Sequence, residues 1–123
     1  MQLSQTEEKL MHFLWKRNRA YMKDLISDFP PPKPAKTTVA TLLKRMVEKG
    51  FVGYDQSGNA REYYPLVKKK EYSSNRVNGL IKSFFNNSAA QLASFCTTEN
   101  NLSTSELEAL KKIIDEQIEK RKK

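Results

Sequence analysis

The sequence predicts a mainly α-helical fold that contains one small β-hairpin. Three observations support this expectation. Up to Lys49, apolar residues return every three or four positions in three separate segments, which is typical of amphipathic helices. Residues 51–66 then place branched and aromatic residues in near alternation around a turn, and beyond Lys68 the helical spacing resumes. We therefore expect two domains, at residues 1–67 and 68–123.

The first helix is expected to begin after Ser4 and to end near Asn18. Ser4 and Glu7 have the spacing of a capping box, in which each side chain accepts a hydrogen bond from the other residue's backbone N–H. Its apolar face is formed by Leu10, Phe13 and Leu14. A shorter second helix follows and stops at Pro30, because proline lacks the backbone donor. The apolar face of that helix is formed by Met22, Leu25, Ile26 and Phe29.

A third helix is predicted between Lys36 and Lys49. Its apolar residues fall within an arc of about 140°, the width of a stripe that faces a core; they are Val39, Leu42, Leu43, Met46 and Val47. The remaining face carries Thr37, Ala40, Thr41, Lys44 and Glu48, with Thr38 and Arg45 along one edge. Gly50 is expected to end the helix in a left-handed conformation, which glycine adopts without steric cost.

Residues 51–55 and 61–66 are predicted to be two strands, because the Ser-Gly-Asn sequence at 57–59 between them has the residues of a turn. A weaker signal predicts a short third strand near Ala20 and Tyr21. The order helix, helix, helix, strand, strand predicts a winged helix-turn-helix, in which the hairpin is the wing.

Beyond Lys68 the sequence predicts a helical dimerisation region. Three apolar stripes at helical spacing are expected to form its interface; they consist of Val77, Leu80, Ile81, Phe84 and Phe85, then Leu92 and Phe95, then Leu107, Leu110, Ile114 and Ile118. About 55 residues can hardly close a large core alone, since such small domains bury only around 60% of their surface. We therefore expect a homodimer, in which these helices pack against a second copy.

The chain is strongly basic, with 22 lysine and arginine residues against 14 aspartate and glutamate residues, a formal charge of +8. Residues 1–67 and residues 68–123 each carry 11 basic and 7 acidic side chains, so each part has a charge of +4. The positive charge is therefore spread over both parts and is not confined to a basic tail. Polyanions are natural partners of such a protein.

Other features limit the location and chemistry of the protein. No apolar run approaches the roughly 20 residues of a membrane helix, and the N-terminus lacks the pattern of a signal peptide. We expect a cytoplasmic protein without membrane insertion. Cys96 is the only cysteine, so the sequence predicts neither a disulfide framework nor a paired-thiol metal site, and no cofactor is expected.

The polar face of the third helix suits the major groove of duplex DNA, where threonine, alanine, lysine and arginine can contact base edges or phosphates. The expected DNA-binding residues are Lys36, Thr37, Thr38, Ala40, Thr41, Lys44 and Arg45, together with Arg61 near the hairpin tip. Lys23 and Lys33 could add phosphate contacts. The alternative is an ordinary solvated helix face, but the position between a short helix and a hairpin favours DNA binding.

Two runs of the sequence resemble the BlaI/MecI family of penicillinase and methicillin-resistance repressors. They are residues 38–51, Thr-Val-Ala-Thr-Leu-Leu-Lys-Arg-Met-Val-Glu-Lys-Gly-Phe, and residues 61–67, Arg-Glu-Tyr-Tyr-Pro-Leu-Val. The resemblance covers nearly the whole chain. It implies a homodimer that represses resistance genes by binding inverted-repeat operators in double-stranded DNA. It also implies recognition by Thr37, Thr38, Thr41, Lys44 and Arg45, whereas relatives often place another residue at Ala40.

The resemblance further implies induction by proteolysis, triggered by a membrane sensor that binds β-lactam. The matching bond in this sequence is Ser94–Phe95, where relatives commonly have asparagine before phenylalanine. A copper-responsive branch of the family carries a cysteine cluster at its C-terminus. This sequence has no such cluster, so a metal sensor is not expected.

Other functions remain open from the sequence. His12 and Cys96 have no catalytic partner nearby in the sequence, and no phosphate loop or histidine pair is present, so an enzyme is not expected. A winged helix can also bind a protein or RNA partner, since a fold does not dictate a function. A transcriptional activator would share the DNA-binding features of a repressor.

Overall fold

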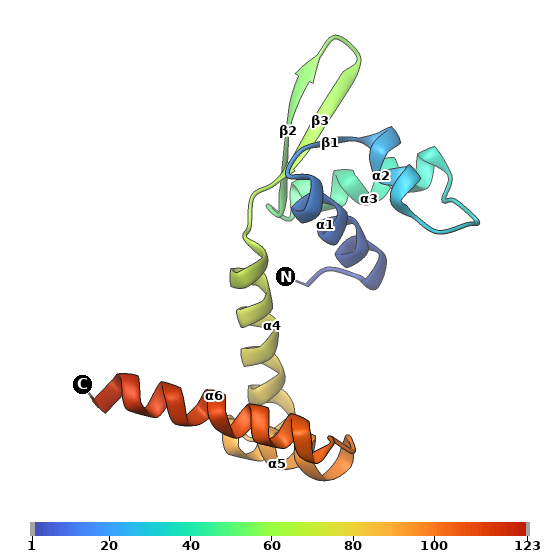
Figure 1. The fold of residues 1–123 in the computed structure, drawn as a ribbon. Coiled ribbons are helices and arrows are strands. Elements are labelled where there is room, and N and C mark those ends of the chain that lie inside the picture. Colours follow the sequence, from blue (N-terminus) through green and yellow to red (C-terminus); the bar gives the residue numbers. More distant parts are fainter. Residues whose placement is uncertain (1, 123) are drawn as a thin grey trace. The chain divides into compact units, whose positions relative to one another are not determined.

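A computed structural model describes residues 2–122, which form six helices and a three-stranded antiparallel sheet (Figure 1). The chain divides into two compact units, Met1–Ser74 and Asn75–Lys123. The first unit contains α1 (Gln5–Arg17), β1 (Ala20–Tyr21), α2 (Met22–Asp28), α3 (Lys36–Glu48), β2 (Val52–Ser57) and β3 (Ala60–Pro65). This is the winged helix-turn-helix order that the sequence predicts.

The helix boundaries follow the predicted signals. Ser4 Oγ accepts a hydrogen bond from the Glu7 N–H at 3.2 Å, and Glu7 Oε1 accepts one from the Ser4 N–H at 2.8 Å, which confirms the capping box of α1. At the end of α3, Gly50 has φ +83°. Its N–H donates to the Val47 carbonyl and the Phe51 N–H donates to the Met46 carbonyl, both at 3.0 Å, which is the Schellman pattern.

The sheet has the strand order β1-β3-β2, so the short strand predicted near Ala20 is present and pairs with the wing. In the wing, Ser57 pairs with Ala60 and only two residues form the turn. The strands therefore extend further into the predicted turn than expected, because Gly58 adopts φ +61° and closes the hairpin.

A single hydrophobic core holds the N-terminal unit together. Its largest fully buried side chains come from all three helices and from β2; they are Leu10, Met11, Leu14, Leu25, Val39, Leu43, Met46 and Val52. Three of the five residues in the predicted stripe of α3 are fully buried, while Leu42 and Val47 pack at the edge of the core. The opposite face of α3 is consequently left to solvent.

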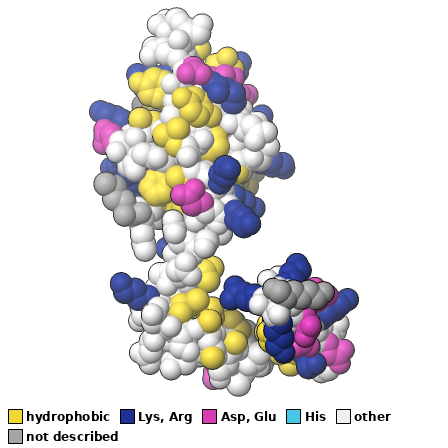
Figure 2. All heavy atoms as spheres, turned by 90° about the vertical axis from the view of Figure 1, so that its left-hand side faces the viewer, with side chains coloured by type: hydrophobic (Ala, Val, Ile, Leu, Met, Phe, Trp, Pro, Cys, Tyr) yellow, Lys and Arg dark blue, Asp and Glu magenta, His cyan; other side chains and the backbone are white. Residues whose placement is uncertain are grey.

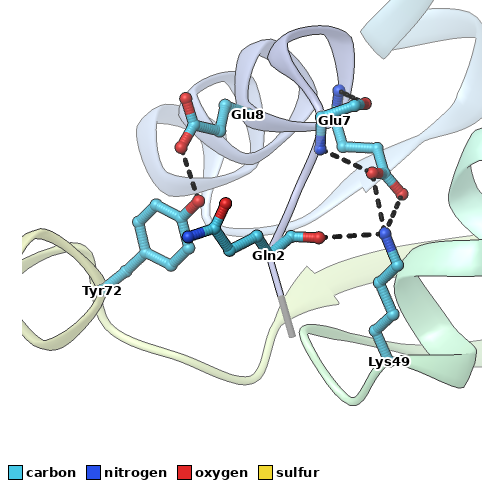
Figure 3. Close-up of polar contacts among 6 residues, drawn as sticks. Gln2, Glu7, Glu8, Lys49 and Tyr72 are labelled. Atoms are coloured by element: carbon cyan, nitrogen blue, oxygen red, sulfur yellow. Dashed lines mark hydrogen bonds and ion pairs between the residues drawn. The ribbon is translucent and has the colours of Figure 1, made fainter. Parts of the chain in front are cut away.

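One charged pair is enclosed beside this core. Glu7 is 2% exposed, and its two carboxylate oxygens accept hydrogen bonds from Lys49 Nζ at 3.0 and 3.3 Å. Lys49 also donates to the Gln2 carbonyl, so the start of α1 is tied to the end of α3 (Figure 3). Burial would raise the pKa of Glu7, but the bonds from Ser4 and Lys49 and the Lys49 charge outweigh it, so this pKa lies below its ordinary value.

The N-terminal unit includes the first residues of α4 (Lys69–Phe84), so it extends past the boundary expected after Val67. Trp15 Nε1 donates to the Val67 carbonyl at 2.9 Å, and the Tyr72 hydroxyl bonds to Glu8 Oε2 at 2.5 Å (Figure 3). The Tyr72 ring also lies against Trp15 and Phe51, with centroids 5.7 and 5.8 Å away. These contacts join the residues that follow the wing to α1.

The C-terminal unit consists of the rest of α4, then α5 (Ala89–Glu99) and α6 (Thr104–Lys122). Ser88 caps α5, and Ser103 Oγ accepts a hydrogen bond from the Glu106 N–H at the start of α6. Among the residues that the structure describes, none in these helices is fully buried. Hydrophobic side chains therefore remain on their surface, as Figure 2 shows in yellow.

Candidate nucleic-acid interface

The residues predicted to bind DNA lie on the solvent side of α3. Its seven predicted residues are all exposed; they are Lys36, Thr37, Thr38, Ala40, Thr41, Lys44 and Arg45. The helix has 13 residues, which corresponds to about 20 Å at 1.5 Å per residue and suits a major groove. The apolar stripe on the other side fixes the rotation of α3, so this polar face is held outward by the core.

Thr41 has a defined hydrogen bond on this face. Its hydroxyl donates to the Thr37 carbonyl, one helical turn earlier, at 3.0 Å. The hydroxyl proton is therefore occupied, whereas the oxygen lone pairs and the methyl group remain available for a base edge. Methyl contact with thymine and acceptance of a hydrogen bond are the two kinds of base contact that this arrangement favours.

A groove separates the first half of α3 from the wing. It has a volume of about 650 Å³ and is lined by Tyr21, Met22, Lys23, Lys36, Ala40, Ser57, Asn59, Ala60, Arg61 and Tyr63. Three of these described lining residues are cationic and none is acidic. The groove therefore brings Lys36 and Ala40 of α3 together with Arg61 of the wing, as a polyanion-binding surface requires.

Arg61 is held on the groove side of the wing. Its guanidinium carbon lies 4.4 Å from the centroid of the Tyr54 ring on β2, a distance typical of a cation–π contact. The guanidinium is exposed, so the stacking orients the side chain without covering its charge. Tyr54 therefore orients a side chain close to the hairpin turn.

Not every predicted cation reaches this groove. Lys33 Nζ donates to the Ser27 and Phe29 carbonyls at 2.9 and 2.6 Å, so it caps the end of α2 and does not line the groove. Lys44 and Arg45 lie further along α3 and outside the lining. They remain on the exposed face of the helix, where they could meet phosphates beyond the groove.

One charged cluster, on the opposite side of the wing, was not predicted from the sequence. Arg19, just before β1, forms ion pairs with Asp55 of β2 and Glu62 of β3. Its guanidinium also lies over the Tyr64 ring, 4.6 Å from the centroid. These partners are 36 and 43 residues away in sequence, and no local pattern indicates such a pairing.

The two residues considered for catalysis belong to different units of the chain. His12 is exposed on α1 with its ring edge-on to Trp15, and Cys96 is a free, half-buried thiol on α5. Within residues 2–122, no group of three histidine, cysteine, aspartate or glutamate side chains could hold a metal ion. No helix in this range is long and apolar enough to cross a membrane.

The sequence profile of the penicillinase repressor family matches residues 3–116. The chain belongs to the penicillinase repressor family. It is 27% identical to the methicillin resistance regulatory protein MecI of Staphylococcus aureus over 119 residues, which cover 93% of this chain and 94% of MecI. It is 21% identical to the penicillinase repressor of Bacillus licheniformis over 122 residues, which cover 98% and 95% of the two chains.

Among solved structures, the chain is similar to the CopR repressor, with a TM-score of 0.46 and 26% identity over 55% of this chain and all of that one. Membership of the penicillinase repressor family confirms the family resemblance found in the sequence and the winged-helix fold. The protein is thus a DNA-binding transcriptional repressor, and the expectation that it is not an enzyme is confirmed by the family.

Proposed function

We propose that this repressor binds inverted-repeat operators as a homodimer, with one half-site for each copy. In this proposal α3 enters the major groove and presents Thr37, Thr38 and Thr41 to base edges, while Lys36, Lys44, Arg45 and the wing residue Arg61 contact phosphates. The observation that carries the proposal is the groove between α3 and the wing, whose charged lining residues are all cationic.

The exposed apolar residues of the C-terminal unit support the homodimer. Eight large apolar side chains of this unit are each 42–74% exposed in the single chain; they are Val77, Leu80, Phe84, Phe95, Leu110, Ile113, Ile114 and Ile118. Apolar surface of this extent is rare on a monomer and marks an interaction site. A second copy is the partner that matches it, because inverted repeats require two winged helices with two-fold symmetry, spaced by about one helical turn of DNA or a multiple of it.

The regulated genes are proposed from the relatives. The names of MecI and of the Bacillus licheniformis protein refer to methicillin resistance and to penicillinase. We infer that this repressor controls genes for β-lactam resistance and that a membrane sensor–protease system relieves the repression.

We propose that this induction cuts the chain between Ser94 and Phe95. Both residues are exposed near the middle of α5, and a cut there would separate α6 from α4 in the chain. A protease binds an extended substrate, so α5 would have to unwind locally, which breaks contacts such as that of Phe95 with Phe85.

Cleavage at this bond predicts a defined fragment. In cells of origin treated with a β-lactam, N-terminally tagged protein should yield a fragment that ends at Ser94, as measured by mass spectrometry. Phe95→Ala should suppress the fragment, whereas Cys96→Ala, on the same helix, should not. Derepression with an intact chain, or a fragment with a different end, would refute the proposed site.

The proposed division of roles between α3 and the wing can be tested on a duplex that the wild-type protein selects from a random-sequence pool. Thr41→Val keeps the methyl group and Thr41→Ser keeps the hydroxyl, so the two variants should shift base preference at one position, by about 1–3 kcal/mol.

Arg61→Ala should weaken binding to every sequence and lower the slope of log K against log salt by about one.

Thr6 on α1 provides the matched control, since it is exposed and lies on another helix. Thr6→Val and Thr6→Ser should leave the selected sequence unchanged. An unaltered base preference in both folded Thr41 variants would exclude Thr41 as a reader. A sequence-specific effect of Arg61→Ala would instead place Arg61 on a base edge.

A further inference from the structure

A charged cluster lies on the face of the wing opposite the groove. We call Arg19, Asp55, Glu62 and Tyr64 the Arg19 cluster. Arg19 Nε donates to Glu62 Oε1 at 2.8 Å, and Nη2 donates to Asp55 Oδ2. Arg19, which precedes the edge strand β1, therefore reaches both β3 and β2.

The register of the wing explains why this arginine is needed. Asp55 and Glu62 are direct partners on β2 and β3, so their carboxylates lie side by side on one face of the hairpin. The next pair toward the turn, Gln56 and Arg61, faces the other way, and Arg61 lines the groove. Two like charges directly opposite each other repel, and Arg19 is the cation that lies between them.

The charge balance of the wing also depends on Arg19. The strands β2 and β3 contain Asp55, Glu62 and Arg61, which gives the hairpin a charge of −1; adding Arg19 brings it to zero. Asp55 and Glu62 are each separated from the two-residue turn by two strand residues, so they lie about 10 Å along the strand from it. This distance is close to the screening length, about 8 Å at 0.15 M and about 10 Å at 0.1 M ionic strength, so a phosphate at the wing tip would still be repelled by both carboxylates, at reduced strength.

We propose that Arg19 enables the wing to approach DNA by neutralising Asp55 and Glu62, and that it holds the wing at the groove without touching the nucleic acid. Arg19 is thus a positioning residue for the established DNA binding. The inference rests on the proposed role of the wing.

Rescue by removal of the carboxylates tests this role. Arg19→Gln should weaken binding to the selected duplex roughly fivefold to tenfold, because each uncompensated carboxylate repels the nearest phosphates. Adding Asp55→Asn and Glu62→Gln to that variant should restore affinity to within about twofold of wild type. The double variant with Arg19 intact should bind at least as tightly as wild type.

Arg17 provides the matched control, since it is also exposed and ion-paired, with Asp28 at 2.7 Å, but lies away from the wing. Arg17→Gln removes the same charge and should change affinity less than twofold. If Arg19 instead contacted a phosphate or served only as a tie between strands, removing the carboxylates would not restore binding, and that result would overturn the inference.

The same assay separates this inference from the proposed function. Arg61→Ala should weaken binding if the wing contacts DNA. If Arg61→Ala leaves the affinity for the duplex unchanged, the proposed role of the wing is wrong and the inference about Arg19 is overturned with it. A weakened Arg61→Ala beside an unaffected Arg19→Gln would overturn only the role of Arg19.

Discussion

Replacing Leu110 and Ile114 of α6 with glutamate should convert the repressor into a monomer and weaken its binding to an inverted-repeat duplex by about 100-fold. The two side chains are 42% and 53% exposed in the single chain, so a partner could still bury about half of each. A dimer would lose the burial of four such side chains, two from each copy. At roughly 1 kcal/mol each, the loss is about 4 kcal/mol, which lowers the dimerisation constant nearly a thousandfold. Operator affinity would follow, because a monomer loses the advantage of linked half-sites.

Sedimentation equilibrium would measure the mass, and a gel-shift titration would measure the operator affinity. Lys112→Glu is the matched control, since it makes the same change of −2 in charge on the exposed polar side of α6. It should remain a dimer. A monomeric double variant that binds the inverted repeat with wild-type affinity would contradict the proposed architecture.

Glu7→Gln should lower the free energy of unfolding by about 2–3 kcal/mol at pH 7. The substitution leaves the Lys49 ammonium, whose side chain is 26% exposed, without its carboxylate partner. Removing one partner of a buried ion pair lowers the free energy of unfolding because the other charge is left without a partner. Lys49 keeps some access to solvent, so the loss should be smaller than for a fully enclosed pair. Urea unfolding followed by circular dichroism would measure the change.

The pH dependence of this effect has a definite sign. The folded protein lowers the pKa of Glu7, so its carboxylate contributes stability above the unfolded pKa of about 4.3. That contribution is lost as the pH falls through the lower folded pKa. The difference between wild type and Glu7→Gln should therefore be constant near neutral pH and shrink below about pH 4.

A double-variant cycle with Lys49→Met would isolate the pair. The two substitutions together should cost less than the sum of the single changes, because each removes the same interaction. Glu48→Gln, on the exposed side of α3 next to Lys49, should change stability by less than about 0.5 kcal/mol. Additive costs for Glu7 and Lys49 would show that the pair contributes nothing beyond its separate side chains.

Much of the winged helix could be predicted because its signals are local. The capping box of Ser4 and Glu7 spans three residues, and the spacing of Val39, Leu43 and Met46 determines which side of α3 is buried. The same spacing predicts that Thr41 is exposed, and Gly50 and Gly58 mark two of the positions where the backbone has a positive φ.

The long-range polar contacts could not be predicted in this way. Glu7 was expected as a cap, but its bond to Lys49, 42 residues away, depends on the packing of α1 against α3. Arg61 was predicted as a DNA contact, whereas its stacking on Tyr54 depends on the register of the hairpin. Arg19 carried no signal at all, because its partners come from two other strands.

Recovery of genomic DNA is the most direct test of the central claim that the protein is an operator-specific dimeric repressor. The purified protein would be incubated with sheared DNA from its organism of origin at near-physiological salt, and the bound fragments would be sequenced. We predict enrichment of a few promoter fragments that share an inverted repeat, with half-sites about one helical turn apart or a multiple of it. Recovery of fragments without a common sequence, or of none, would contradict the account and favour a protein or RNA partner.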